Sequence, residues 1–335
     1  MRASRSPLTV VGLALGAAVC TTLAHTTPRR LARADELKTM ESSAAVTRNE
    51  GCARCHAVQW REWTGSLHQR SHDDETYRAS LAGEPRAFCD ACHGPLASAP
   101  RGGALGIGCT GCHALPADHE RRPAQGAAPA QVSAPAKFGV RCEPCHEFRF
   151  PRGSELMQHT VREHRASAFA STSCVDCHMP ITGKGAERHH RHDASASRDP
   201  ALLRRSLLAS ARLLGPGSLE VTLKTRGVGH AMPTGDMFRR LVVRAEALDG
   251  ANEVVSRAER VLARRFELRP DGPREIGDDR PSGAAGAEVV VGLDLGEVAP
   301  NARVRWRVDY ERVVNGFKSP ATVAASLTLA GGEVR

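Results

Sequence analysis

The sequence predicts a chain in two parts, a mainly helical and loop-rich domain over residues 45–200 and an all-β, sandwich-like domain over residues 216–335. Three observations predict it. Every cysteine precedes residue 178, whereas strict alternation of apolar and polar residues begins only after residue 218. Between them, Gly215-Pro216-Gly217 is typical of a boundary. With 335 residues, 41% of them hydrophobic, neither a disordered chain nor a protein with many membrane spans is expected.

The N-terminus has the pattern of an export signal. Two arginines precede an apolar run over residues 8–19, and small residues follow up to Ala24. We therefore expect a signal peptide over residues 1–24 that is removed together with Cys20. The alternative is an uncleaved anchor over residues 8–24 in the inner membrane. In both cases we expect a periplasmic or otherwise exported protein of the cell envelope.

The ten remaining cysteines form five Cys-x-x-Cys-His motifs with none left over. By composition alone, this pattern is expected about 0.02 times in the chain. The motifs are Cys52/Cys55/His56, Cys89/Cys92/His93, Cys109/Cys112/His113, Cys142/Cys145/His146 and Cys174/Cys177/His178.

This spacing is what covalent haem attachment requires. Two thiols three residues apart each form a thioether with one vinyl group of haem, and the adjacent histidine ligates the iron from one face. Zinc ribbons also use Cys-x-x-Cys pairs, but zinc needs no histidine after each pair and five pairs would leave one over. Disulfides are the other alternative, and so short a spacing favours cofactor or redox chemistry. The motifs therefore predict five covalently attached haem c groups, with iron, in a multihaem cytochrome c domain.

Composition agrees with five haems. About 25 residues per motif cannot bury a large aliphatic core, so the porphyrins would form the core themselves. The chain has 46 Lys and Arg against 37 Asp and Glu, and the excess of arginine suits haem propionates. The net charge of +9 would also suit a nucleic-acid partner. Because we expect export and pairing of arginines with propionates, we expect no nucleic-acid partner.

The second axial ligand decides between an electron carrier, with both iron faces filled, and a site for substrate, with one face open. Histidines outside the motifs are numerous enough to fill every second position. Trp60, Trp63 and Leu67 repeat at helical spacing and place His68 at the edge of an apolar face. His119 follows the third motif closely and suits a loop that folds back over a neighbouring haem.

Two further ligands are predicted from local patterns. A helix over residues 154–170 would place Met157, Val161 and His164 on one stripe, so His164 is a candidate ligand, with an ordinary core histidine as the alternative. His159 would point elsewhere on this helix.

The run from Arg188 to His192 offers one ligand, for which His190 is the first choice and His192 the second. His72, among acidic residues, is expected to be solvated.

His230 is the last candidate. Val221–Thr225 has the pattern of a strand, after which Gly227 and Gly229 allow the backbone to leave the sheet and approach a flat ligand. A loop histidine that is hydrogen-bonded within the sandwich is the alternative. Methionine ligands stay open, with candidates at Met157, Met232 and Met237, but we expect mostly bis-histidine haems.

After the last motif, Asp199-Pro200 predicts the start of a helix that runs to Leu214. Alternation then predicts six strands, and two stretches rich in small and polar residues, 121–137 and 271–286, are expected to be flexible loops. The strands are expected at residues 219–223, 241–247, 254–268, 289–295, 304–310 and 323–329.

At these residues the sequence resembles multihaem cytochromes c of the c-552/c-554 type. The resemblance rests on the first motif followed by Trp63-x-x-Ser66-x-His68, on Gly106-Ile107-Gly108 before the third motif, and on Met179-Pro180 after the fifth. It extends to Gly229-His230-Ala231-Met232-Pro233-Thr234-Gly235 and so covers residues 50 to 240.

The resemblance implies a mostly helical haem domain, stacked haem pairs, electron transfer in the cell envelope, and distal roles for His68, His119, His190 and His230. A fifth motif and a β-domain depart from the family, so its redox partners do not carry over. We expect an electron carrier between other redox proteins of the envelope. The alternative is a haem enzyme that converts a small nitrogen or sulfur compound at one five-coordinate haem. No Cys-x-x-Cys-Lys motif is present, which removes the lysine-ligated haem of pentahaem nitrite reductases.

We predict that the mature protein carries five covalent haems. Its intact mass after acid-acetone extraction should exceed that of the polypeptide by five haem units. Retention of four or fewer would show that one motif does not hold haem.

Overall fold

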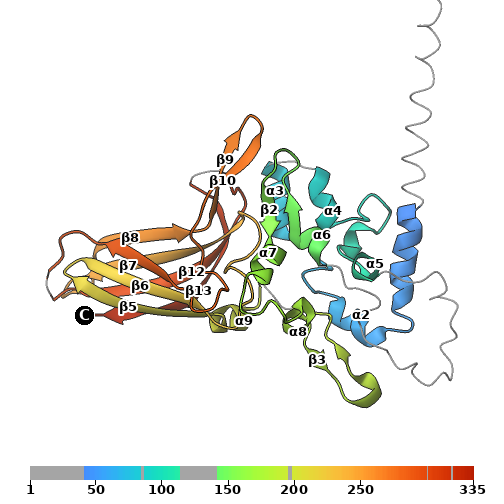
Figure 1. Ribbon diagram of the computed structural model, residues 1–335, viewed down its shortest axis with the longest axis horizontal. Coiled ribbons are helices and arrows are strands. Elements are labelled where there is room, and N and C mark those ends of the chain that lie inside the picture. The colour runs from blue at the N-terminus through green and yellow to red at the C-terminus, as the bar shows by residue number, and fades with distance from the viewer. Residues whose placement is uncertain (1–40, 84–86, 114–141, 195–197, 300, 318–319) are drawn as a thin grey trace, which may run out of the picture.

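The computed structural model describes residues 41–83, 87–113, 142–194, 198–299, 301–317 and 320–335. Figure 1 shows two regions side by side, a β-rich region that ends in the C-terminus and a region of short helices and small sheets that holds all five motifs. The predicted signal segment, His119 and the predicted loop 121–137 lie outside the described residues. Within the described part of the chain, no helix has both the length and the apolar character needed to cross a membrane.

The motif region begins with a helix over residues 41–52, and its later helices are short. They are α2 (Ala57–Trp63), α3 (Glu75–Gly83), α4 (Asp90–His93), α5 (Cys109–Cys112), α6 (Glu143–His146), α7 (Thr160–Arg165) and α8 (Cys174–His178). Single 3-10 turns occur at η1 (Ala87–Cys89), η2 (Gly103–Leu105) and η5 (Gly185–Glu187). Two small antiparallel sheets pair β1 (Glu147–Arg149) with β2 (Leu156–His159) and β3 (Ile181–Thr182) with β4 (His189–His190).

The prediction of a mainly helical fold is wrong. The described residues are 25% helix and 35% strand, and several small sheets replace expected helix. Four of the helices, α4, α5, α6 and α8, are single turns of four or five residues that coincide with a motif. A motif needs only one turn to place its two cysteines and its histidine. Longer helices would need an apolar face to pack, and these segments have no buried residues of their own.

The predicted helix over residues 154–170 is also wrong. Its first part is strand β2, in which Leu156 and Gln158 are buried by period-two alternation, and only Thr160–Arg165 is helical. Pairing with β1 decides the outcome, because the register Glu147↔His159 gives this segment a partner strand that the sequence pattern does not reveal.

The protein core of the motif region is small, as the composition predicts. It consists of Val46, Trp63, Ala99 and Leu105, with Trp60 and Leu96 against it. The Trp63 Nε1 donates a hydrogen bond to the Ile107 carbonyl oxygen at 3.0 Å, which ties α2 to the segment before the third motif.

The β-rich region is a sandwich of two antiparallel sheets, as predicted. The sheet β11-β6-β5 packs against the sheet β13-β12-β7-β8. Their bounds are β5 (Leu207–Gly215), β6 (Ser218–Thr225), β7 (Arg239–Leu248), β8 (Val254–Leu262), β11 (Val289–Asp294), β12 (Arg303–Val313) and β13 (Val323–Val334). Alternate residues of the strands, such as Leu219 and Val221 in β6 and Val304 and Val308 in β12, fill the space between the sheets.

The sandwich begins earlier than expected. Asp199 caps a helix, as predicted, but this helix, α9 (Pro200–Arg205), ends after six residues and β5 follows. Gly215-Pro216-Gly217 is the turn between β5 and β6 and not a link between domains. Residues Leu208 to Leu214 favour a helix, but they form a strand because they pair with β6, and their burial alternates along that strand.

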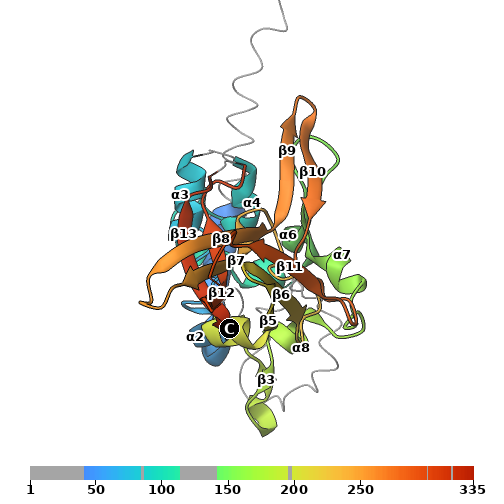
Figure 2. The same ribbon diagram turned by 90° about the vertical axis from the view of Figure 1, so that its left-hand side faces the viewer.

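A hairpin of β9 (Arg264–Arg269) and β10 (Gly272–Asp278) projects from the sandwich, as Figure 2 shows. The expected single strand 254–268 is therefore two strands, and the expected loop 271–286 contains β10. At the base of the hairpin the Arg264 side chain is fully buried and donates to the carbonyl oxygens of Leu156 and Met157, both at 2.6 Å. The hairpin thereby joins the sandwich to β2 of the motif region.

Candidate haem sites

The last four motifs each end on a histidine at or next to the C-terminus of a single turn of helix. In α8 the turn is fixed by Ser173, whose hydroxyl accepts from the Val175 backbone N–H at 3.2 Å, while the Asp176 carboxylate accepts from the Ser173 backbone N–H at the same distance. The first motif differs, because its Cys52 is the last residue of the helix over residues 41–52 and its His56 caps α2.

The motif cysteines are not equally enclosed by protein. Seven of the ten are half-buried, but Cys55, Cys174 and Cys177 are exposed. At Cys55 and Cys177 the polypeptide itself supplies little cover. Cys55 lies in an exposed turn before α2, and Cys177 lies on a single turn of helix that buries none of its residues. A thiol that has to reach the edge of a flat group needs such access, so both remain candidates for attachment.

Three motif histidines face a second imidazole from another part of the chain. The ring centroids are 6.4 Å apart for His146 and His68, 6.1 Å for His113 and His192, and 6.2 Å for His178 and His230. The partners come from the segment after α2, from the segment after β4, and from the loop after β6. Three unrelated segments thus produce the same spacing.

This spacing fits one metal ion held between two imidazoles. A metal–imidazole bond is about 2 Å long and the ring centre lies roughly 1 Å behind the nitrogen, so two imidazoles on opposite sides of one ion have ring centres about 6 Å apart. Direct stacking of two rings would bring them much closer, as in the 4.0 Å contact between Tyr77 and His93. The pairs therefore have the geometry of axial ligands.

Four of the six paired imidazoles have a lowered pKa, which favours their neutral form. Burial lowers the pKa of His68, His192 and His230, and burial followed by the charge of His68 lowers the pKa of His146 to about 4. Neutral imidazole is the form that binds metal. The Nδ1 of His230 bonds to the Ala231 carbonyl oxygen at 2.9 Å, which leaves its Nε2 lone pair for an ion.

Sulfur contacts show which motifs are neighbours. Hydrogen bonding raises the pKa of Cys92 and lowers that of Cys145 to about 7, and the same kind of contact couples Cys142 with Cys174, whose pKa falls to about 6. The Cys109 pKa is raised by its contact with Cys52. Motif four therefore adjoins motifs two and five, and motif three adjoins motif one.

The second motif is different. Its His93 donates from Nδ1 to the Ser71 carbonyl oxygen at 3.2 Å, and its ring stacks on Tyr77 at an interplanar angle of 1°. The Tyr77 hydroxyl in turn contacts Asp90 at 2.8 Å. Among the described residues, no imidazole stands opposite His93 at the spacing of the three pairs.

Among the described residues, the predicted ligands His190 and His164 are not part of such a pair. His190 bonds through Nδ1 to the Met179 carbonyl oxygen at 2.6 Å and pairs with Ile181 across β3 and β4, so His192 and not His190 faces a motif histidine. His164 packs against Gly229, where an added Cβ would lie 2.9 Å from its Cδ2.

His56 is exposed, and His119 lies outside the described residues. His159 contacts Glu163 at 3.1 Å, and His72 contacts Asp73 at 3.2 Å.

Two contacts of Glu62 explain why His192 takes this position. The Glu62 carboxylate bonds to His189 Nε2 at 3.1 Å and accepts from the His192 backbone N–H at 3.0 Å. It thereby holds the end of the histidine run against α2. From the sequence, His192 is only the second choice as a ligand within this run. Glu62, which accepts from its backbone N–H, lies 130 residues away and cannot be recognised from the sequence as its partner.

A buried cation adjoins the second and fourth motifs, and a second arginine lies near it. Arg239 of β7 lies close enough that its charge, after burial, contributes to lowering the pKa of both His93 and His146. Arg312 of β12 has a buried Nη1 without a hydrogen-bond partner among the described residues. Burial and the charge of Arg198 lower the pKa of Arg312. Such donors suit the carboxylates of a haem. Imidazoles, thiols and cations thus all fit haem c.

Together, fold and site define a multihaem cytochrome c-like architecture. The structure is similar to that of the penta-haem cytochrome c552 from Thermochromatium tepidum, with a TM-score of 0.61, and the match covers 85% of this chain and 97% of that one. At 20% sequence identity, the likeness establishes the fold. No family model and no curated protein matches the sequence.

We predict that His192→Ala and His190→Ala differ in effect. His192→Ala should convert one low-spin haem to high spin in the ferric spectrum, because it removes the imidazole opposite His113. His190→Ala should leave the spin state unchanged and serves as the matched control. The reverse result would assign the ligand to His190.

Proposed function

We propose that this protein binds haem c at its five motifs and carries electrons between redox proteins of the bacterial cell envelope. Haem iron, once bound, takes up and releases single electrons. In this proposal the ten motif cysteines attach the groups, including the exposed Cys55, Cys174 and Cys177. His68, His192 and His230 are distal ligands to the fourth, third and fifth motifs. The proximal ligands are His56, His93, His113, His146 and His178.

The three imidazole pairs carry the proposal. With both axial positions taken by protein, an iron has no coordination site for substrate, and the ligands hardly move when its charge changes by one. This combination supports a carrier rather than an enzyme at the third, fourth and fifth motifs.

The order of the motifs in space supports a branched path. The Cys92–Cys145 and Cys142–Cys174 contacts bring motif four against motifs two and five. The charge of Cys145 also contributes, after burial, to raising the pKa of Cys112, which puts motif three beside motif four. Motif four is then the junction of motifs two, three and five, and motif one joins the path through motif three.

An enzyme that converts a small nitrogen or sulfur compound is the second candidate, and one observation favours it. His93 has no facing imidazole among the described residues, so the second motif is where an open iron would occur. Arg239 and Tyr77 lie near His93, and both residue types orient small anions or donate protons.

Spectroscopy distinguishes the two candidates. For a carrier, the ferric protein should be low-spin at motifs three, four and five, and the reduced protein should bind no carbon monoxide there. Carbon monoxide at one haem only, with loss of that binding when His93 is replaced, would favour the enzyme at the second motif. Carbon monoxide binding at three or more haems would contradict the ligand pairs and the proposed function with them.

A further inference from the structure

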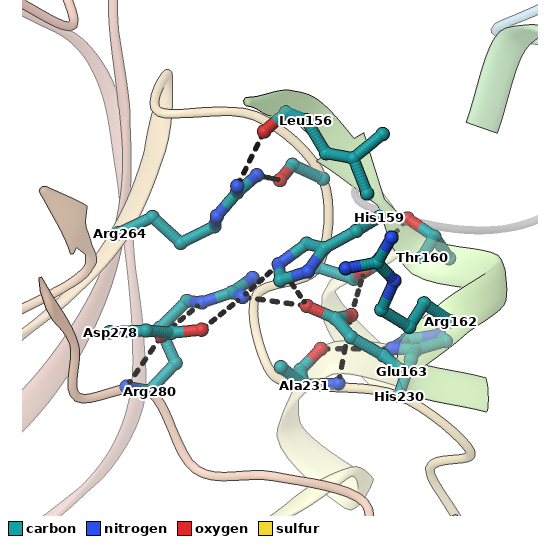
Figure 3. A network of polar contacts seen from close by, with 12 residues as sticks. Leu156, His159, Thr160, Arg162, Glu163, His230, Ala231, Arg264, Asp278 and Arg280 are labelled. Atoms are coloured by element: carbon teal, nitrogen blue, oxygen red, sulfur yellow. Dashed lines mark hydrogen bonds and ion pairs between the residues drawn. The ribbon is translucent and has the colours of Figure 1, made fainter. Parts of the chain in front are cut away.

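The segment that presents His230 crosses from the sandwich to the motif region and is held there by two charged side chains. We propose that Glu163 of α7 and Arg280 after β10 are positioning residues that fix the His230 imidazole opposite His178. The inference rests on the proposed function in one respect, that His230 is a ligand. Figure 3 shows the network.

Glu163 hydrogen-bonds to the backbone next to His230. Its Oε2 accepts from the Ala231 backbone N–H at 3.1 Å and from the Thr234 hydroxyl at 2.5 Å. Although burial alone raises the pKa of this carboxyl, the hydrogen bond from His159 and the charge of Arg280 lower it to about 2. The group is therefore a carboxylate at neutral pH, and both bonds from the segment are charge-assisted.

Arg280 holds the same segment from the side of the sandwich. Its side chain is 1% exposed. Its Nη1 donates to the Pro233 carbonyl oxygen at 2.6 Å, while its Nη2 donates to Glu163 at 2.6 Å and to Asp278 at 2.7 Å. A buried guanidinium with three fixed acceptors has little freedom, so Arg280 ties Glu163 and the His230 segment into one unit.

Close backbone packing prevents the segment from shifting instead. A Cβ added at Gly283 would lie 2.7 Å from the His230 backbone nitrogen, and one added at Gly229 would lie 2.9 Å from the His164 ring. The Met232 N–H also donates to the Pro281 carbonyl oxygen at 2.8 Å. His164 therefore packs against this segment at Gly229.

These contacts determine where the imidazole lies, because they act on the backbone and side chains of residues 231, 233 and 234 and not on the His230 ring, which faces His178. Partners of metal ligands commonly change metal affinity 10- to 100-fold, roughly, when removed. We call Glu163 and Arg280, with their bonds to residues 231, 233 and 234, the clamp. Loss of the clamp should therefore weaken the bond between iron and the His230 imidazole without altering either imidazole.

The test compares Glu163→Gln and Arg280→Met with the full-length haem-loaded protein. Each should give a high-spin fraction at one haem in the ferric spectrum, and carbon monoxide should bind that haem about tenfold faster or more in the reduced protein. His230→Ala identifies the haem concerned, because the same spectral component should change in all three variants. Circular dichroism and haem content verify that each variant is folded.

Arg264→Met is the matched control. Arg264 is as buried as Arg280 and bridges the same two regions, but it reaches Leu156, Met157 and Gly235 and none of residues 230 to 234. Its ferric spectrum should match that of the unmodified protein.

If Arg264→Met has the same effect as Arg280→Met, the effect is general loosening and the positioning role is overturned. If both clamp variants stay low-spin while His230→Ala changes, the positioning role is likewise overturned. If His230→Ala itself has no effect, the ligand assignment within the proposed function fails.

Discussion

The constraint on which the rest of this structure depends is that two imidazoles face each other with their ring centres about 6 Å apart. It recurs at His146/His68, His113/His192 and His178/His230. Satisfying it requires each of these motifs to present its histidine from a single turn of helix and a distant segment to present the second. The motif region is consequently made of short turns and connecting loops around a small protein core, and its remaining apolar filling is left to the groups that the motifs attach.

The sandwich contributes to that constraint and is not a separate appendage. Its loop after β6 supplies His230, and its buried Arg264 and Arg280 bond to β2 and α7 of the motif region. A buried charge without partners is costly, so each arginine also keeps the two regions in register. Arg239 extends the contact to the vicinity of His93 and His146. The facing of His178 and His230, buried charge and packing thus place the two regions in one arrangement.

The features that follow from local chemistry could be predicted from the sequence. The five motifs are local by nature, and the alternation in β6 and β12 reports burial between two sheets directly. The errors arise where a partner outside the segment decides. Residues 156–159 become a strand because β1 pairs with them, and β5 replaces a helix because β6 pairs with it across a short turn. His192 rather than His190 faces His113 because Glu62, 130 residues away, holds the run.

Locating the irons tests the central claim most directly. Anomalous scattering at the iron edge, measured on crystals of the haem-loaded protein, gives each iron position independently of any assumed ligand. The account predicts an iron within about 2 Å of Nε2 of both His178 and His230, and equivalent positions between the other two pairs. An iron that is bound by His178 but has another residue, or none, on its opposite face would contradict it.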